Sequence, residues 1–428
     1  MAGRRPSTDL GLPRGIRDIE PKEYELHSKV RAAFEEVARI YNFQTMEPAS
    51  IEHLTTLRVK SGEEIDKEIY AFKDKGGRDV GLRFDLTVGL ARYVCSRKDL
   101  KLPAKVAAFG GMWRYDEPQH ARFRWAHQWD LEVFGPPSVD SDAEIIDASA
   151  AILRKLGIRG STVRIGDRRV VEEYIGTVLG VRDETRKVEL MRALDKVEKK
   201  TQAELEDEYL AKGITKDQFG GLMGLAKLRG PPNEVLQKAD ALHLTSTGEL
   251  GTLLEVLDSR GVKNIEYNMS TVRGIDYYTG IVFEAFDKAH PALGSLFGGG
   301  RYDILPRLFG RNDLSATGAA GGVERESMSM GSSESELKTL VHVSFANEGN
   351  YPEAVRAMSE VRGAGISADI SRRGRSLAKQ FEEARSSGAR WVLIVGEREL
   401  AKGTVTLRNL AEHTEIEVSL ADAIKAVS

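Results

Sequence analysis

The sequence predicts an α+β core built on a mainly antiparallel sheet, a helical insertion within that core, and a separate C-terminal α/β domain. Three observations lead to this prediction. Residues 105 to 135 contain two strand-like stretches joined by a polar turn, which is typical of an antiparallel pair. Residues from about 175 to 250 carry mixed charge at helical spacing, and strand patterns return after them. Beyond residue 338, strands and helices alternate.

The core is expected to begin with a helix and to end in strands. Between Pro21 and Tyr41, apolar side chains recur at helical spacing, which predicts one amphipathic helix. An apolar, turn-rich stretch then leads through Met46, Glu47 and Pro48. Further strand patterns lie within residues 265–286 and 315–323. Because these elements enclose the charged stretch, we interpret residues 175 to 250 as a helical insertion, and its charged side chains as a solvated face.

The polar stretch from Ser327 to Glu334 predicts a linker. We therefore place the first domain at residues 1–330, the linker at 331–337 and the second domain at 338–428. The second domain is expected to contain three strands and two helices, in the order strand 340–343, helix 351–362, strand 366–370, helix 376–387 and strand 391–395. Such a βαβα order favours a substantially parallel sheet.

The composition of the 428 residues is that of a soluble globular protein, with 30% charged and 41% hydrophobic residues. The formal net charge of −3 indicates that any RNA would be bound by local patches. Cys95 is the single cysteine, so a disulfide framework and a cysteine-ligated zinc site are excluded, and we expect a buried structural thiol. The sequence shows no apolar run of membrane-spanning length, no signal-peptide pattern and no metal-ligand spacing. We therefore expect a cytoplasmic protein.

The stretch 123–133 alternates between an apolar and a polar face. The apolar face contains two tryptophans and a phenylalanine, which indicates a large core. The polar face carries Gln128, Asp130 and Glu132 together with Arg124. A half-exposed strand also alternates in this way. Nevertheless, both charge signs combined with an amide suit a zwitterionic ligand better than plain solvent.

Other polar groups accompany this strand. Arg114 and Asp116 share one face of the preceding strand, and Arg83, Asp85 and Thr87 share one face if residues 82–87 are extended. The glycines at 298–300 allow a tight turn or a close backbone approach. Neither a P-loop spacing nor a GxGxxG after a strand is present, which disfavours the usual nucleotide-binding folds.

At these residues the chain resembles the histidyl-tRNA synthetase family of class II aminoacyl-tRNA synthetases. WRYDEPQHARFRWAHQWDLEVFG resembles the family's motif 2, and RGIDYYTG resembles its histidine-specific signature. LRFDLT, GGGRYD and GGVER resemble its amino-acid loop, glycine turn and motif 3. The helix from Pro21 leading to Glu47 and Pro48 resembles motif 1, the dimer-forming segment. The resemblance is collinear over nearly the whole chain, so it implies a class II core at residues 1–330 and an anticodon-binding domain at 338–428.

The resemblance implies ATP-dependent activation of histidine to histidyl-adenylate, followed by transfer of histidine to its tRNA. Arg114 and Arg273 would be catalytic and would hold the α-phosphate and the histidine carboxylate, whereas Arg325 would hold the γ-phosphate. Asp116 and Arg122 would also contact ATP, and Mg²⁺ would accompany the phosphates. The structural alternative is that each arginine is a surface residue or is ion-paired, for example Arg273 with Asp276.

The implied histidine site has two ends. The ammonium group would be held by Asp85, Thr87 and Gln128. The imidazole needs a partner on each ring nitrogen. By resemblance these partners come from Glu132 and the tyrosines, namely Tyr277, Tyr278 and Tyr302. A buried polar pocket of this kind rejects amino acids that leave its groups unpaired, by roughly 10⁴-fold or more.

Three positions depart from the family pattern. Members usually carry an aromatic residue where Ala126 lies, often a phenylalanine where Ala319 lies, and a glycine where Ala121 lies. Alanine cannot stack on adenine. Trp125 is adjacent, but its place in the alternation points it into the core. The departures therefore leave open how the adenine is held, but they do not affect the implied phosphate and histidine contacts.

For RNA, the resemblance implies contacts from Gln119 and from the basic residues Arg372, Arg373 and Arg375. These three and Lys379 lie near one strand-to-helix junction, and four such basic residues also fit a solvated face. The resemblance also implies a homodimer through motif 1. The main alternative is a non-catalytic relative, the synthetase-like regulatory subunit of histidine biosynthesis. A synthetase for another amino acid is a further alternative, which Glu132 and the Tyr277–Tyr278 pair disfavour.

Overall fold

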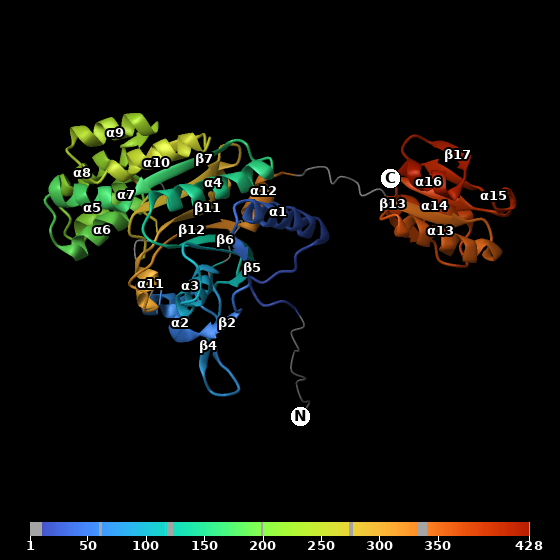
Figure 1. Ribbon diagram of the computed structural model, residues 1–428, viewed down its shortest axis with the longest axis horizontal. Coiled ribbons are helices and arrows are strands. Elements are labelled where there is room, and N and C mark those ends of the chain that lie inside the picture. The colour runs from blue at the N-terminus through green and yellow to red at the C-terminus, as the bar shows by residue number, and fades with distance from the viewer. Residues whose placement is uncertain are drawn as a thin grey trace, which may run out of the picture. The chain divides into compact units, whose positions relative to one another are not determined.

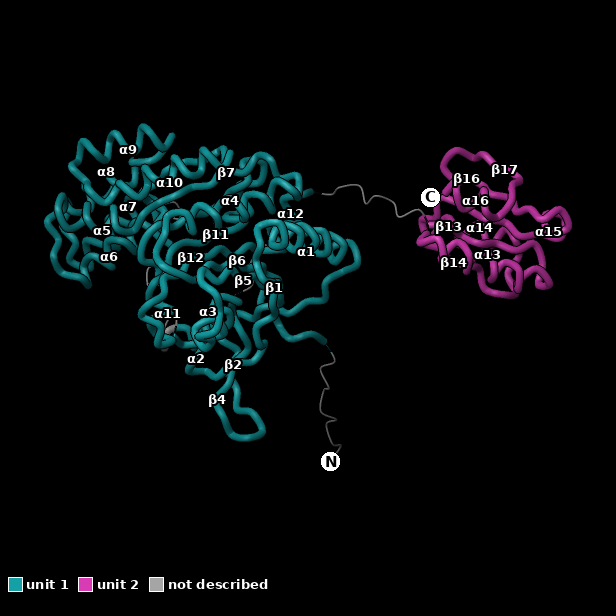
Figure 2. Tube along the Cα trace, in the orientation of Figure 1, with its two compact units in different colours: residues 1–331 teal, residues 332–428 magenta. Residues whose placement is uncertain are grey.

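The computed structural model describes residues 11–59, 62–115, 117, 123–197, 200–273, 277–331 and 340–427. The chain divides into two compact units, residues 1–331 and 332–428 (Figure 2).

The first unit is built on one large sheet. Among the described residues it has nine strands, in the order β1-β5-β6-β12-β11-β10-β7-β9-β8. Six of the eight neighbouring pairs are antiparallel, which confirms the predicted mainly antiparallel sheet. The strands are β1 (Gln44–Thr45), β5 (Ala104–Trp113), β6 (Trp125–Gly135), β7 (Ser161–Asp167), β8 (Arg229–Gly230), β9 (Ile265–Asn268), β10 (Ile281–Asp287), β11 (Ser295–Arg301) and β12 (Ser315–Gly322).

Helices cover one face of this sheet (Figure 1). They include α1 (Pro21–Ile40), α4 (Val139–Lys155), α10 (Gly248–Ser259) and α12 (Val323–Ser329). The predicted first helix is confirmed, because Val30 and Phe34 on its apolar side are fully buried. Phe34 stacks on Trp129 of β6 with ring centroids 6.2 Å apart, so the odd-numbered residues of β6 face the helices. The even-numbered residues therefore face the opposite side.

The helical insertion is also confirmed. After α5 (Arg168–Thr177) come α6 (Glu184–Asp195), α7 (Gln202–Ala211), α8 (Lys216–Ala226) and α9 (Pro232–Ala241). Thr201 and Thr215 form capping boxes that satisfy the first amide groups of α7 and α8. The apolar sides of these helices join the main core through Leu194, Tyr209 and Phe219.

Smaller elements cover the opposite face of the sheet. A three-stranded sheet has the order β2-β4-β3. Its strands and the neighbouring helices are β2 (Ile51–His53), β3 (Ala71–Lys73), β4 (Asp79–Leu82), α2 (Leu54–Arg58), η1 (Gly62–Lys67), α3 (Thr87–Ser96) and α11 (Ile304–Leu308). The short helix η2 (Pro291–Leu293) connects β10 to β11 and contacts α12. The prediction that residues 82–87 are one strand was wrong, because β4 ends at Leu82 and Thr87 begins α3.

The polar stretch from Ser327, which suggested a linker, begins inside a helix, before the linker predicted at residues 331–337. Ser327 and Ser329 belong to α12 and are buried, and the Ser329 hydroxyl donates to Asp287 Oδ2 at 2.7 Å. Serine suggested a linker, but tertiary contacts hold these residues in a helix. Cys95 is buried, and burial raises the pKa of its thiol to about 11, as expected for a structural cysteine. Within the described residues, no helix is long and apolar enough to span a membrane.

The second unit is a five-stranded sheet with helices, in the strand order β14-β13-β15-β16-β17. Its elements are β13 (Leu340–Phe345), η3 (Glu348–Asn350), α13 (Tyr351–Gly363), β14 (Ser367–Ile370), α14 (Leu377–Ser386), β15 (Trp391–Val395), α15 (Glu397–Lys402), β16 (Val405–Asn409), β17 (Thr414–Val418) and α16 (Leu420–Val427). The three predicted strands are parallel, whereas β16 and β17 add an antiparallel edge.

Candidate active site

A cavity of about 450 Å³ lies on the face of the large sheet opposite α1 and α4, which is a usual size for a small-molecule site. Its walls come from β6, β11, β12, the start of α3 and the segment before β10. All the predicted histidine-site residues line it, together with two predicted ATP-site arginines: Asp85, Thr87, Arg114, Gln128, Glu132, Arg273, Tyr277, Tyr278, Tyr302 and Arg325. The predicted residues Asp116, Gln119 and Arg122 lie outside the described part of the chain.

One end of the cavity carries Glu132 and three tyrosines. The Tyr302 hydroxyl donates to Glu132 Oε2, and both side chains are almost fully buried. Burial and the Glu132 charge raise the pKa of Tyr302 well above its usual value, so its phenol stays protonated. The rings of Tyr277 and Tyr278 lie beside it, with centroids 4.2 Å apart. This end presents a carboxylate and phenol groups to a ligand.

Room for Glu132 comes from the strand beside it. Gly318 on β12 pairs with Glu132 on β6, and a Cβ at Gly318 would lie 1.5 Å from Glu132 Oε2. Only glycine leaves space for the carboxylate at this point. The small-residue pattern of β12 therefore serves the pocket directly.

A buried carboxylate orients the neighbouring polar groups. Thr87 Oγ1 donates to Asp130 Oδ2 at 2.9 Å, and Gln128 Nε2 donates to Asp130 Oδ1 at 2.6 Å. Asp130 is fully buried and lies behind the cavity wall. The sequence analysis placed Asp130 on the correct strand face but missed this positioning role. The signal was present, because Asp130 lies between Gln128 and Glu132 on the same face.

Three arginines line the rest of the cavity. Arg114 Nε donates to the Phe84 carbonyl at 2.8 Å, and Arg325 Nη1 donates to the Ser295 carbonyl at 2.9 Å. Arg273 Nε lies 2.9 Å from Glu284 Oε1. In each case one guanidinium nitrogen contacts a protein oxygen and holds the side chain in place. The planar guanidinium group suits phosphate or carboxylate oxygens.

Arg273 lies across the pairing of β10 and β11. Glu284 and Gly298 are register partners there, and a Cβ at Gly298 would lie 1.5 Å from Arg273 Nη1. The predicted glycine turn is instead an extended strand, so the close-approach interpretation of residues 298–300 holds. The partner considered from the sequence, Asp276, lies outside the described residues, and the described partner of Arg273 is Glu284.

Ala126 lines the cavity, as does Ala319, so neither supplies an aromatic ring. Trp125, which is half-buried, lies on the face of β6 that carries His127, with ring centroids 5.3 Å apart, and it is absent from the cavity lining. Phe123 and His127, which the alternation of residues 123–133 placed on the core-facing side, line the cavity instead. The Arg17 guanidinium lies 3.9 Å from the centre of the Phe123 ring.

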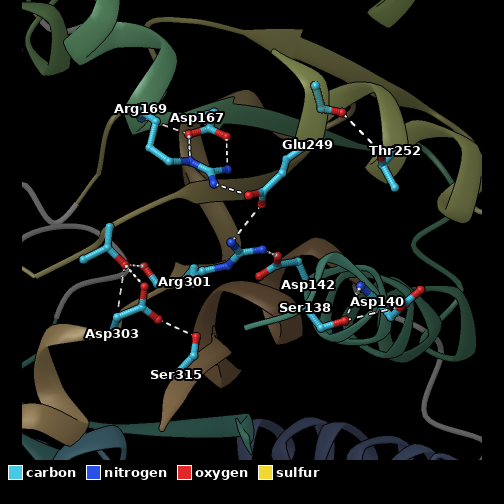
Figure 3. Close-up of polar contacts among 12 residues, drawn as sticks. Ser138, Asp140, Asp142, Asp167, Arg169, Glu249, Thr252, Arg301, Asp303 and Ser315 are labelled. Carbon is cyan, nitrogen blue, oxygen red and sulfur yellow. Dashed lines mark hydrogen bonds and ion pairs between the residues drawn. The ribbon is translucent and has the colours of Figure 1, made fainter. Parts of the chain in front are cut away.

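Buried ion pairs support the strand end that carries Tyr302. Figure 3 shows Arg301 between Asp142 of α4 and Glu249 of α10, and Glu249 also pairs with Arg169. Arg301 is only 6% exposed, and its backbone carbonyl accepts the Thr279 N–H at 2.8 Å. The same residue therefore contacts α10, which follows the insertion, and the segment that carries the pocket tyrosines.

Arg83 does not reach the cavity. Its guanidinium donates to the carbonyls of Gly111 at 2.7 Å and Pro48 at 2.6 Å, and it is 3% exposed. The extended pattern assumed for residues 82–87 breaks at Leu82, so Arg83 points away from Asp85. Arg83 is a structural residue that ties β5 to the segment before β2.

The predicted RNA contacts of the second unit lie in the exposed segment between β14 and α14. Arg372 is exposed, Arg373 lies over the Tyr351 ring at 4.3 Å, and Arg375 Nε lies 2.7 Å from Glu383 Oε1. The cluster thus combines an exposed arginine with one arginine stacked on a ring and one in an ion pair.

Known proteins resemble both units. Residues 15–325 match the histidyl-tRNA synthetase family, and residues 340–428 match the anticodon binding domain family. The histidine–tRNA ligase of Pyrobaculum neutrophilum is 36% identical over 418 residues, covering 96% of this chain and 97% of that protein. The enzyme of the same name from Pyrococcus furiosus is 34% identical over 423 residues, covering 96% of this chain and 97% of its own length.

Solved structures agree with these matches. The crystal structure of histidyl-tRNA synthetase from Nostoc sp. PCC 7120 superposes with a TM-score of 0.85 at 25% identity, covering 98% of this chain and 99% of that one. An ATP phosphoribosyltransferase regulatory subunit/histidyl-tRNA synthetase from Bacillus halodurans C shares the fold, with a TM-score of 0.76 at 24% identity over 91% of this chain and 98% of its own. From the family matches, the near-complete coverage and the cavity residues, the chain belongs to the histidyl-tRNA synthetase family of class II aminoacyl-tRNA ligases.

Proposed function

We propose that the cavity performs both steps of histidine–tRNA ligation. The histidine carboxylate attacks the α-phosphate of ATP and displaces pyrophosphate, and the terminal ribose of tRNA then takes histidine from the adenylate. The observation that carries the proposal is one cavity lined by three arginines and by a buried Glu132–Tyr302 pair.

Histidine is recognised at the Glu132 end. Because Glu132 accepts from Tyr302, it keeps its place and presents a carboxylate to one imidazole N–H. Tyr277 and Tyr278 lie close enough to enclose the ring, and one of their hydroxyls serves the second nitrogen. An amino acid without two ring nitrogens would leave these buried groups unpaired, which is costly.

The histidine ammonium is held by Asp85, Thr87 and Gln128. Asp130 supports this role, because it fixes the hydroxyl of Thr87 and the amide of Gln128. Gln128 therefore turns its carbonyl oxygen away from Asp130, and that oxygen lies 3.4 Å from Arg114 Nη2. The two ends together set where the histidine carboxylate lies relative to the arginines.

The arginines stabilise the charge that develops at phosphorus. Arg114 and Arg273 bind the α-phosphate and the histidine carboxylate, and Arg325 binds the γ-phosphate. Phosphoryl-transfer sites act mainly by positioning and electrostatic stabilisation, so permanently charged, preorganised guanidinium groups suit this reaction. Asp116 and Arg122 are proposed to complete the ATP contacts.

We also propose how the adenine ring of ATP is held. Phe123 takes the stacking role that Ala126 and Ala319 cannot fill, because its ring lines the cavity while Arg17 covers it at 3.9 Å. Phe123→Ala should raise KM for ATP without changing KM for histidine. Equal KM values for ATP in the variant and the parent would exclude this stacking role.

A divalent metal ion accompanies ATP in class II synthetases, and we propose Mg²⁺. Mg²⁺ favours oxygen ligands and usually takes one or two carboxylates besides phosphates and water. Glu324 fits this need, because it is the carboxylate beside Arg325 in the cavity lining and it is 4% exposed. The ion would neutralise phosphate charge.

For tRNA, we propose that residues 338–428 form the anticodon-binding domain, joined by the linker 331–337 to the catalytic domain 1–330. Arg372, Arg373 and Arg375 would contact RNA phosphates, and Gln119 would contact the acceptor end. The exposure of Arg372 and the position of Arg373 over Tyr351 support this.

We further propose a cytoplasmic homodimer that forms through the motif 1 region, α1 to Pro48. Exposed apolar side chains there, including Tyr24 at 65% and Ile40 at 60% exposure, support the dimer. Sedimentation that gives only monomer at micromolar concentration would contradict it.

The deciding experiment is ATP–pyrophosphate exchange measured with each of the twenty amino acids. Exchange should depend on histidine, and Arg273→Lys should lower its rate by roughly 10²-fold with a smaller change in KM for ATP. The regulatory-subunit alternative requires no exchange with any amino acid. Glu284→Gln is the matched control, because it removes the ion pair of Arg273 but leaves the guanidinium group in place.

A further inference from the structure

Three potential metal ligands meet where α1, β6 and the start of α12 come together, and two of them, His127 and Glu324, also line the cavity. They are His27 on α1, His127 on β6 and Glu324 at the start of α12, and we name them the His-His-Glu cluster. One ligand atom from each lies within 4.8 Å of the other two. His127 Nδ1 is 3.9 Å from Glu324 Oε1, and the two imidazole rings meet edge to face with centroids 5.4 Å apart.

Three of the four imidazole nitrogens of this cluster make no hydrogen bond within the part of the chain that the structure describes. Within the described residues, neither ring nitrogen of His27 has a hydrogen-bond partner, although His27 is only 5% exposed. Nδ1 of His127 is also buried without one. Glu23 Oε1 lies 3.4 Å from His27 Nε2, but Arg17 holds that carboxylate. Buried polar atoms are nearly always satisfied, so three such nitrogens at one place point to a missing ligand.

We propose that the His-His-Glu cluster binds one divalent metal ion of the zinc class. One nitrogen of each imidazole and one oxygen of Glu324 would supply three ligands. Two histidines and a glutamate form a known zinc-binding set that leaves a fourth position for water. The side chain of His127 is 23% exposed, so water can reach this position. Metal–ligand bonds of about 2 Å place neighbouring ligands roughly 3.3 Å apart, so the three side chains would close inward by about 1 Å.

The local charge favours a cation. The charged and titratable groups that act on His27 are Glu324, His127, Glu23 and Arg17. Two carboxylates against one guanidinium leave one net negative charge around the imidazoles.

This site differs in chemistry from the Mg²⁺ that accompanies ATP. Imidazole suits zinc and other transition metals, whereas Mg²⁺ prefers oxygen ligands. Glu324 has two carboxylate oxygens, so one can face the imidazoles while the other faces the cavity. The proposal needs neither ATP nor histidine, and it stands or falls independently of the proposed function.

The test uses the full chain without a histidine tag, stripped with chelator and kept in excess Mg²⁺. Co²⁺ replaces zinc as a spectroscopic probe. We expect one Co²⁺ per chain, visible absorption bands of a low-coordinate nitrogen–oxygen site, and their loss when Zn²⁺ is added. His27→Gln should weaken Co²⁺ binding by about 100-fold or more. His53→Gln is the matched control, because His53 is exposed on β2, and it should bind Co²⁺ as the parent does.

Two results would overturn the proposal: no stoichiometric Co²⁺ binding by the parent chain, or unchanged binding by His27→Gln. If His27→Gln does not fold, X-ray absorption of the zinc-loaded parent decides. Two imidazole ligands support the site, and a signal without imidazole ligands rejects it.

Discussion

Replacing Gly298 with alanine should displace the Arg273 guanidinium group and so impair its function, although Arg273 itself is not mutated. The added Cβ would lie 1.5 Å from Arg273 Nη1 and 2.7 Å from Cζ, whereas an ordinary contact needs about 3.4 Å. The guanidinium must therefore move by roughly 2 Å, and a displacement of even about 1 Å in a positioning group can cost about 10²-fold in rate. We expect the histidine-dependent exchange rate to fall by about 10²-fold or more, which corresponds to about 2.7 kcal/mol in the barrier.

The control variant is Gly299→Ala, at the neighbouring glycine of β11. A Cβ at Gly299 would lie 2.0 Å from the Gly318 carbonyl oxygen, which is backbone and cannot swing aside. Gly299→Ala should therefore lower Tm strongly, whereas Gly298→Ala, which meets a flexible side chain, should lower Tm only slightly. Exchange kinetics and thermal melting of both variants test this contrast.

A double-mutant cycle tests whether the loss of exchange rate in Gly298→Ala comes from displacing Arg273. In an Arg273→Ala background, Gly298→Ala should cost almost nothing further, because the group that it displaces is already absent. Additive losses would show that Gly298→Ala acts through the β10–β11 pairing. An exchange rate within threefold of the parent would refute the assigned position of Arg273.

Three further predictions concern single carboxylates. Glu132→Ala removes an imidazole partner and should weaken histidine binding by about 1–3 kcal/mol in calorimetry, and unchanged affinity would place Glu132 outside the site. Glu249→Gln weakens the contacts to Arg301 and Arg169, so KM for histidine should rise several-fold and more than KM for ATP, whereas Glu255→Gln on the exposed side of α10 should change neither. Glu326 is buried against Trp129 Nε1 at 2.9 Å, and burial raises its pKa to about 8. A raised folded-state pKa means that protonation stabilises the fold at low pH and that this contribution is lost as pH rises from about 4.5 through about 8. Glu326→Gln should therefore show a flatter Tm over that range, and parallel curves for the two proteins would contradict the buried-acid assignment.

The sequence alone determined the features that depend on local periodicity. The apolar repeat of residues 21–41 and the alternation of residues 123–133 each specify a face, because helices and strands repeat every 3.6 and 2 residues. The even-numbered face of β6 was therefore predictable, and with it the location of Gln128 and Glu132 in the cavity. The family motifs added the arginines, which no local pattern distinguishes from surface residues.

Only the tertiary structure decided which distant groups meet. The sequence analysis considered Asp276 as a partner for Arg273, but the described partner is Glu284, which the β10–β11 register places opposite Gly298. The same applies to His27, His127 and Glu324, which no spacing rule connects because they come from three separate elements. Ser327 belongs to the polar stretch that suggested a linker, yet it is buried because α12 packs against the sheet. Contacts of this kind depend on how helices and strands that are far apart in the chain pack against one another. Such packing leaves no periodic pattern in the sequence of any single helix or strand.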